Sequence, residues 1–129
     1  MLIRSAKSSK STYTPYDVER TRKAISYIHY HYKDHISTDQ LAIEVSIDKR
    51  KLQKVMRAIT GLTIHHYIIK TRLDHAMEEL DEKFELTIEQ IAYRNGFPSS
   101  SWFIKHFRGR TGLTPKKYQF QLLNVGKSL

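Results

Sequence analysis

Cysteine is absent from this chain of 129 residues, so neither disulfide bonds nor thiolate chemistry can contribute to its fold or function. No run of eighteen apolar residues occurs, which excludes an ordinary membrane-spanning helix. The segment Met1–Tyr16 lacks the apolar stretch of a signal peptide, and we therefore expect a cytoplasmic protein. Glycine-rich phosphate loops and the pattern His-Glu-x-x-His are also missing. The chain thus lacks the usual carriers of catalytic and cofactor chemistry.

An enzyme is the first alternative that these absences weaken. The chain has seven histidines, and His31 and His35 have the spacing of two metal ligands on one helix. Histidines on a polar surface explain the set better, because no cysteine or other ligand motif accompanies them. We expect no catalytic residue, no metal site and no cofactor.

Acidic residues are few relative to basic ones. Twenty-two Lys and Arg face thirteen Asp and Glu, which gives a formal net charge of +9. Five basic residues and no acid lie between Lys49 and Arg57, and the same is true between Lys105 and Lys117. Seven acids gather between Asp74 and Glu89, with Lys83 as their only basic neighbour. This distribution predicts a polyanionic partner bound on one side, and a nucleoid-associated location.

The second half of the chain repeats the first. Asp39-Gln40-Leu41-Ala42 returns fifty residues later as Glu89-Gln90-Ile91-Ala92. Further matches are fifty-one residues apart: Leu52, Lys54 and Met56 with Phe103, Lys105 and Phe107, and Thr60-Gly61-Leu62-Thr63 with Thr111-Gly112-Leu113-Thr114. One residue is therefore inserted in the turn between the two blocks. A duplicated, basic, two-helix unit suggests a protein that contacts two successive turns of one DNA groove.

The apolar periodicity predicts an all-α fold with seven helices and no strand. The expected helices cover about 16–35, a short segment after the capping box at Ser37, 49–59, 63–80, a short segment after the capping box at Thr87, 99–111, and 115–122. Gly61, Gly96 and Gly112 are the expected helix ends. Inward positions include Leu52, Val55, Met56, Ile59, Phe97, Phe103 and Phe107.

These elements predict two helix-turn-helix subdomains joined by a long linker helix. We expect a flexible basic arm at 1–16, a DNA-binding domain at 17–122 and a tail at 123–129. Within the domain, the first helix-turn-helix covers about 17–62, the linker helix 63–82 and the second helix-turn-helix 87–122. A linker of seventeen or eighteen residues is about 26 Å long at 1.5 Å per residue, close to the ~34 Å between successive major-groove faces.

The sequence also resembles the DNA-binding region of the AraC/XylS family of bacterial transcription regulators. In the second unit, the resemblance is carried by Ile91-Ala92, Gly96-Phe97, Ser101-Trp102-Phe103, Lys105, Phe107-Arg108, Gly112-Leu113-Thr114-Pro115 and Tyr118. In the first unit and linker it is carried by Leu41-Ala42, Leu52, Gly61, Tyr67-Ile68, Arg72-Leu73, Ala76 and Leu80. It covers roughly residues 17–120.

The resemblance implies a transcription regulator of the activating type. Its two recognition helices would enter adjacent major grooves of double-stranded promoter DNA. It further implies a monomer that recruits RNA polymerase, unless a sensing or dimerisation domain belongs to the protein. Three positions depart from the family pattern. Ser46 stands in place of a glycine in the first turn, Met56 in place of a phenylalanine, and Gln119 in place of an arginine.

Family position and side-chain chemistry together predict the contacts with DNA. The expected contacts with bases are Arg50, Gln53 and Lys54 from the first unit, and Ser100, Ser101, Trp102 and Lys105 from the second, with Trp102 and Ile104 near the rim. The expected contacts with phosphates are Lys49, Lys51, Arg57, Arg108 and Lys116. Because serine side chains are short, we expect the second unit to discriminate less between base sequences than the first unit does.

Two further hypotheses remain. The acids Asp74, Glu78, Glu79 and Glu82 are ordinarily a solvated face, and the alternative is that they meet a basic surface of RNA polymerase. The second rival to a specific regulator is a sequence-indifferent architectural nucleic-acid-binding protein, which positive charge alone would support. Arg50, Gln53 and the repeated caps argue against it, because a pure backbone binder needs no such repeated geometry.

Overall fold

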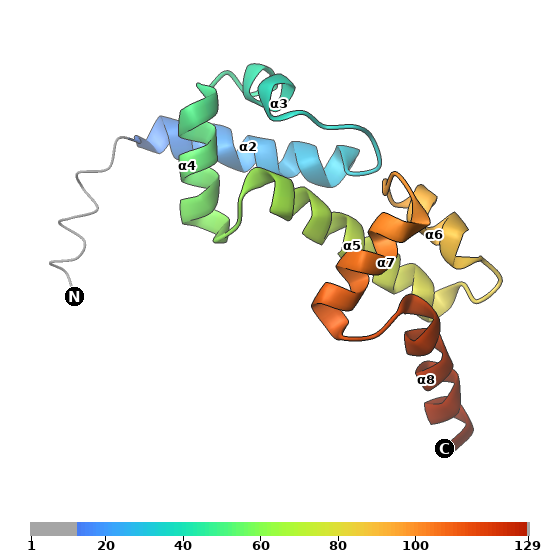
Figure 1. Ribbon diagram of the computed structural model, residues 1–129. Coiled ribbons are helices and arrows are strands. Elements are labelled where there is room, and N and C mark those ends of the chain that lie inside the picture. The colour runs from blue at the N-terminus through green and yellow to red at the C-terminus, as the bar shows by residue number, and fades with distance from the viewer. Residues whose placement is uncertain (1–12, 129) are drawn as a thin grey trace, which may run out of the picture. The chain divides into compact units, whose positions relative to one another are not determined.

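A computed structural model describes residues 13–128 of the chain, with side chains for residues 13–124. The described part is all-α and contains no strand (Figure 1). Its helices are α2 (Pro15–His31), α3 (Thr38–Glu44), α4 (Lys49–Thr60), α5 (Ile64–Glu82), α6 (Ile88–Arg94), α7 (Ser100–Thr111) and α8 (Pro115–Ser128). Seven helices were expected, and these seven confirm the expectation for the described residues.

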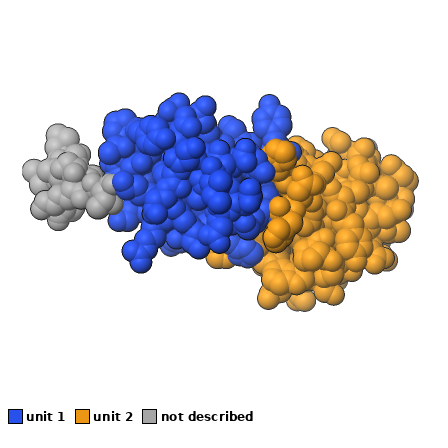
Figure 2. Space-filling model, turned by 90° about the horizontal axis from the view of Figure 1, so that it is seen from above, with its two compact units in different colours: residues 1–30, 36–65 blue, residues 31–35, 66–129 orange. Residues whose placement is uncertain are grey.

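The chain divides into two compact units, coloured separately in Figure 2. The first unit holds the described residues up to 30 together with 36–65, and so contains most of α2 with α3 and α4. The second unit holds residues 31–35 and 66–129, and so contains nearly all of α5 with α6, α7 and α8. The helix expected to be a linker is therefore the first helix of the second unit.

The first unit is held together by an apolar core from its three helices. Asp48 begins α4 by accepting hydrogen bonds from the backbone of Arg50 and Lys51, and Gly61 ends it in the left-handed conformation with φ of 78°. The buried residues, all at most 5% exposed, are Ala24, Ile28, Leu41, Ala42, Val45, Leu52, Val55, Met56 and Ile64. Within each helix these residues are three or four positions apart, so their side chains lie on one face.

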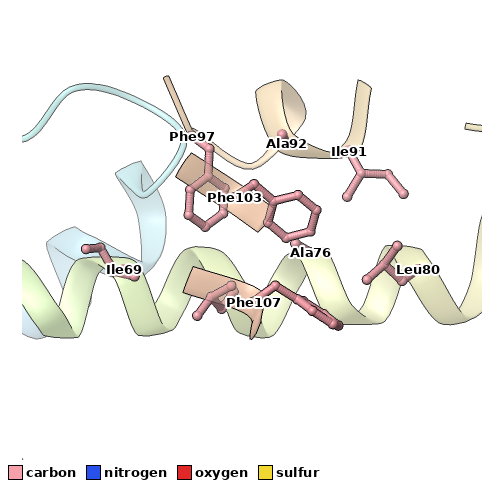
Figure 3. Packing of buried hydrophobic residues seen from close by; sticks show 9 residues of the cluster. Ile69, Ala76, Leu80, Ile91, Ala92, Phe97, Phe103 and Phe107 are labelled. Carbon is pink, nitrogen blue, oxygen red and sulfur yellow. The ribbon is translucent and has the colours of Figure 1, made fainter. Parts of the chain in front are cut away.

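The second unit is built around aromatic side chains from α7 (Figure 3). Phe103 and Phe107 are fully buried, with their ring centroids 5.7 Å apart in an edge-to-face arrangement. Phe97 lies 5.1 Å from Phe103, and Tyr118 of α8 lies 5.4 Å from Phe107. The surrounding core comprises Ile69, Leu73, Ala76, Leu80, Ile91 and Ala92. Burial of Phe97, Phe103 and Phe107 confirms their expected inward positions.

Arg72 fixes the segment 31–35 to the rest of the second unit. Its Nε donates a hydrogen bond to the carbonyl oxygen of Tyr32 at 2.7 Å, and its Nη2 donates to that of Asp34 at 2.8 Å. Burial lowers the pKa of Arg72, which remains a cation at neutral pH. The backbone of Gly96 lies against the same carbonyl, since a Cβ built on Gly96 would be 2.6 Å from the Tyr32 oxygen. This position requires glycine for space as well as for its φ of 90°.

The internal repeat is present in the geometry, and it locates the inserted residue. The amides of Ile47 and Phe97 donate to the carbonyls of Ala42 and Ala92, so the offset is still fifty there. The next helices begin from the N-caps Asp48 and Ser99, where the offset is fifty-one. Pro98 is therefore the extra residue.

Several expected boundaries are corrected by the structure. The first helix begins at Pro15, so residues 15 and 16 do not belong to an arm. It ends at His31 rather than His35, because hydrogen bonds from Arg72 hold the residues that follow. The last helix continues to Ser128 instead of Leu122, since neither glycine nor proline interrupts it before Gly126, and most of the expected tail is helical. Residues 13 and 14 are described and lie before the helix, and the rest of the expected arm, residues 1–12, lies outside the described residues.

Two local expectations also need correction. Ile59 was expected to point inward, but it is 37% exposed. It lies in the last turn of α4, where hydrogen bonds of Thr60 and Gly61 end the helix and no burial of Ile59 is needed. A capping box is complete at Thr87 and Gln90, whereas at Ser37 only the hydroxyl-to-amide half is present. Ser46 does adopt the left-handed backbone expected of it, with φ of 56°. None of the described helices is long and apolar enough to cross a membrane.

Candidate nucleic-acid interface

The outer face of α4, defined by Arg50, Gln53, Lys54 and Arg57, is exposed along its whole length. These residues are three and four positions apart, so they form one stripe opposite the buried Leu52, Val55 and Met56. Arg50 and Arg57 take part in no ion pair with another described residue. A helix with a packed inner face and such a stripe presents base-reading and phosphate-binding groups together.

Lys51 has a partner within its own unit. Its Nζ lies 3.4 Å from Oδ2 of Asp17, a residue that is only 5% exposed. Asp17 also accepts a hydrogen bond from the backbone of Thr14, which lowers its carboxyl pKa, and the charge of Lys51 lowers it further. Lys51 was expected to contact a phosphate. In the structure it pairs with this buried carboxylate, and the phosphate contact stays a prediction.

Lys49 also has a partner, in this case an exposed one. Its Nζ is 2.9 Å from Oδ1 of Asp39 on α3, and both side chains are about half exposed or more. An exposed pair of this kind contributes little stability and exchanges easily. Lys49 therefore remains available for the expected phosphate contact.

The outer face of α7, defined by Ser101, Ile104, Lys105 and Arg108, lies along a surface hollow. The hollow is lined by these four residues together with Gly109 and Gly112. A second hollow on the same unit is lined by Ile104 and by residues at the starts of α6, α7 and α8, among them Thr87, Ser100 and Lys116. The structure thus brings the expected Ser100, Ser101, Lys105, Arg108 and Lys116 to neighbouring hollows that share Ile104.

The Trp102 side chain packs against other side chains of its own helix, α7. Its indole is 44% exposed and stacks on His106, with ring centroids 5.1 Å apart and an angle of 24° between the planes. The Lys105 ammonium lies 5.5 Å from the centre of the same indole. One face of the ring is thus occupied by its own helix, and its expected base contact stays a prediction.

Gln119 stands in place of the arginine that is usual in the AraC/XylS pattern. Its side-chain amide donates to the carbonyl oxygen of Leu80 at 3.2 Å, near the end of α5. Lys116, three residues earlier in the first turn of α8, remains exposed. Glutamine at position 119 therefore has a structural contact inside the second unit.

Two of the four acids considered for RNA polymerase form ion pairs with arginine or lysine side chains of the second unit, and a third, Glu78, lies 3.6 Å from Nδ1 of His75. Asp74 accepts two hydrogen bonds from Arg110, at 2.7 and 2.8 Å, and one from Lys70. Glu79 pairs with Arg94 at 2.7 Å and accepts a further hydrogen bond from the buried Asn95. The hydrogen bonds from Arg94 lower the pKa of the Glu79 carboxyl. Glu78 and Glu82 remain largely exposed.

A short helix, a tight turn and a second helix with a polar outer face recur in each unit, and this arrangement defines a helix-turn-helix protein. The model of a helix-turn-helix domain family matches residues 41–121. The chain therefore belongs to the AraC-type helix-turn-helix family of DNA-binding transcription regulators, a class of DNA-binding proteins rather than of enzymes.

Curated relatives agree with this assignment. An uncharacterised HTH-type transcriptional regulator of Staphylococcus aureus is 32% identical over 78% of this chain and 13% of its own length. An uncharacterised HTH-type regulator from the cgkA 5′ region of Pseudoalteromonas carrageenovora is 32% identical over 76% and 57%. The probable transcriptional regulator LumQ of Photobacterium leiognathi is 30% identical over 80% and 42%. The chain thus spans between about an eighth and just over half of these relatives.

Solved structures share the fold. The C-terminal domain of AraT, a response regulator from Geobacillus stearothermophilus, superposes with a TM-score of 0.74 at 25% identity, over 86% of this chain and 88% of that one. An AraC-type regulator from Chromobacterium violaceum gives 0.74 at 25%, over 81% and 92%. The DNA-binding domain of AdpA, solved with a target DNA, gives 0.73 at 23%, over 78% and 90%.

Proposed function

We propose that the chain recognises an asymmetric promoter site by inserting α4 and α7 into successive major grooves of double-stranded DNA. The observation that carries this proposal is the duplication of an exposed reading face, at positions fifty-one residues apart, behind equivalent N-caps and glycine ends. A protein that bound only the backbone would need charge but no repeated geometry. The DNA-binding domain of AdpA, which shares the fold, is solved in complex with its target DNA.

Each face is assigned a distinct set of contacts. Bases in one half of the site are read from α4 by Arg50, Gln53 and Lys54. Bases in the other half are contacted from α7 by Ser100, Ser101, Trp102 and Lys105. Lys49, Arg57, Arg108 and Lys116 bind phosphates and set the register. Since one chain already contains both reading faces, a monomer is sufficient to occupy the site.

Selection of preferred duplexes from a random pool, at about 150 mM salt, tests this proposal directly. Binding through phosphates alone is weak at that salt concentration and yields no preferred sequence. We expect one asymmetric motif with two blocks about one helical turn apart. Retention of DNA without any enriched motif would support the architectural alternative instead.

We further propose that the bound protein activates transcription through contact of its exposed acids with RNA polymerase. Asp74 and Glu79 are bound by Arg110 and Arg94, so we assign the contact to the two more exposed acids of this set, Glu78 and Glu82. Glu78→Gln combined with Glu82→Gln should lower activated transcription in vitro while leaving the affinity for DNA unchanged. Unchanged transcription from the selected promoter site would reject this role.

A further inference from the structure

We infer that Ile104 is a specificity-determining residue that contacts the 5-methyl group of a thymine in the half-site read by the second unit. The inference rests on the proposed insertion of α7 into the major groove. It concerns a chemical difference between the two half-sites, because the residue at the equivalent position of the first unit is a glutamine.

The equivalence of α4 and α7 is established by matched geometry over their whole length. Both helices have twelve residues, and each ends at a glycine, with φ of 78° for Gly61 and 81° for Gly112. The amides of these glycines donate to the carbonyls of Arg57 and Arg108, both at 2.8 Å. The two final threonine hydroxyls repeat the same pair of contacts. An offset of fifty-one therefore holds for position and orientation alike.

This offset assigns a counterpart to every residue of the outer face of α4. Arg50 corresponds to Ser101, Gln53 to Ile104, Lys54 to Lys105 and Arg57 to Arg108. The two cations are retained, whereas the central hydrogen-bonding side chain has become aliphatic. By the same offset, Trp102 corresponds to Lys51, the residue that turns back to Asp17, and the stacking of Trp102 on His106 agrees with a flanking position.

The surroundings of Ile104 favour an apolar contact with a base over a contact with the protein core. Ile104 is only partly buried, and both hollows of the second unit include it in their linings. Around it lie short residues, Ser101 and Gly109, which leave room for a close approach, and the cations Lys105 and Arg108. An apolar side chain in such a groove matches the thymine methyl, the one apolar group that a base exposes in the major groove.

The test uses the duplex selected by the wild-type protein, with each thymine replaced singly by deoxyuridine, which lacks only the 5-methyl group. At one thymine of one block, we expect the affinity of the wild-type protein to fall about fourfold, as the loss of one buried methyl group predicts. Ile104→Ala should weaken binding to the original duplex and abolish the response to deoxyuridine at that thymine. Gln53→Ala is the matched control and should retain the full response.

A repeated selection with Ile104→Gln provides a second readout. Since glutamine can pair with adenine through two hydrogen bonds, we expect the preference at that position to move from thymine towards adenine. For each protein, the measured quantity is the ratio of its affinity for the original duplex to its affinity for a deoxyuridine duplex. The inference is overturned if this ratio is the same for Ile104→Ala and for the wild type at every thymine. Such a result would leave the proposed function intact, because that function fails only if the wild-type protein selects no motif. Equal melting temperatures of the variants establish that folding is not the cause.

Discussion

At the scale of single residues, the two neighbours Arg50 and Lys51 have opposite roles despite their similar charge. Arg50 is exposed, while Lys51 neutralises the almost buried Asp17. We expect Arg50→Ala to cost about 1–3 kcal/mol of binding to the selected site and to relax the preference at particular bases. Lys51→Ala should instead lower the free energy of unfolding by about 1 kcal/mol, since the pair is partly solvated.

Fluorescence anisotropy with the selected and a random duplex, alongside urea unfolding, separates these two effects. If Lys51→Ala unfolds like the wild type but loses affinity for both duplexes, Lys51 is a phosphate contact and its pairing with Asp17 is incidental. Equal losses on both duplexes for Arg50→Ala would remove Arg50 from the base-reading set.

Gly96 and Gly61 allow a comparison between two residues with similar backbone angles but different surroundings. A Cβ at Gly96 would lie 2.6 Å from the Tyr32 carbonyl oxygen and 2.9 Å from Nε of Arg72, whereas a Cβ at Gly61 meets nothing within 4 Å. Gly61→Ala should therefore cost about 1–2 kcal/mol for its left-handed backbone alone. Gly96→Ala should cost roughly 3 kcal/mol or more, because overpacking adds to the same strain. Matching losses in urea unfolding would show that the contact is not tight.

Contacts between single residues were also the feature that the sequence predicted least completely. Apolar spacing predicted the burial of Phe103 and Phe107, and the chemistry of Arg50 predicted exposure. It could not show that Lys51 faces Asp17, because these residues are thirty-four positions apart and both belong to polar patterns. The offset of fifty-one places Ile104 on the outer face of α7. Side-chain chemistry nevertheless favoured the serines beside it, because hydroxyl groups form hydrogen bonds with bases and an aliphatic side chain does not.

At the scale of secondary-structure elements, the ion pair between Glu79 and Arg94 joins α5 to α6 and should make this junction sensitive to acid. The pKa of Glu79 is lowered below its ordinary value of 4.5, chiefly by hydrogen bonds from Arg94. A carboxyl group with a depressed folded-state pKa contributes its stability in full above the unfolded pKa, and loses it as the pH falls through the folded pKa.

Glu79→Gln should consequently destabilise the protein at pH 7 and have a smaller effect at acid pH, once the pH has fallen through the lowered pKa of Glu79 and the carboxyl group of the wild type is protonated. The measurement is the difference in free energy of unfolding between the two proteins across this range. Glu78→Gln is the control, since the Glu78 side chain is 73% exposed. A difference that stays constant through the whole acid titration of the carboxyl groups would mean that the charge of Glu79 has no part in stabilising the junction.

Element boundaries followed from the sequence where a cap or a left-handed glycine fixed them. The starts and ends of α4 and α7 are of this kind, with Asp48, Ser99, Gly61 and Gly112 as the determinants. The end of α2 is different, because tertiary hydrogen bonds from Arg72 hold the residues that follow it. No local signal in the sequence of 31–35 records that interaction.

At the scale of the whole molecule, the distribution of charge matters more for DNA binding than the net value of +9. Arg110, Lys70 and Arg94 neutralise acids of their own unit, and Lys51 does the same in the other. The cations assigned to phosphates are Lys49, Arg57, Arg108 and Lys116, of which Lys49 forms only an exposed pair with Asp39. The slope of log affinity against log salt concentration is about −0.9 per phosphate neutralised, so we expect a slope near −4.

Lys116→Ala tests this count, because it removes one phosphate contact without touching a base. Its slope should become shallower by about one, and its affinity should fall by the same factor on selected and random duplexes. Arg110→Ala is the comparison: Arg110 is bound to Asp74, and its removal should leave the slope unchanged. A wild-type slope near −8, the value for nine phosphates, would instead mean that the net charge acts as a whole. The pairing of cations with acids inside each unit would then not limit the number of charges that the DNA meets.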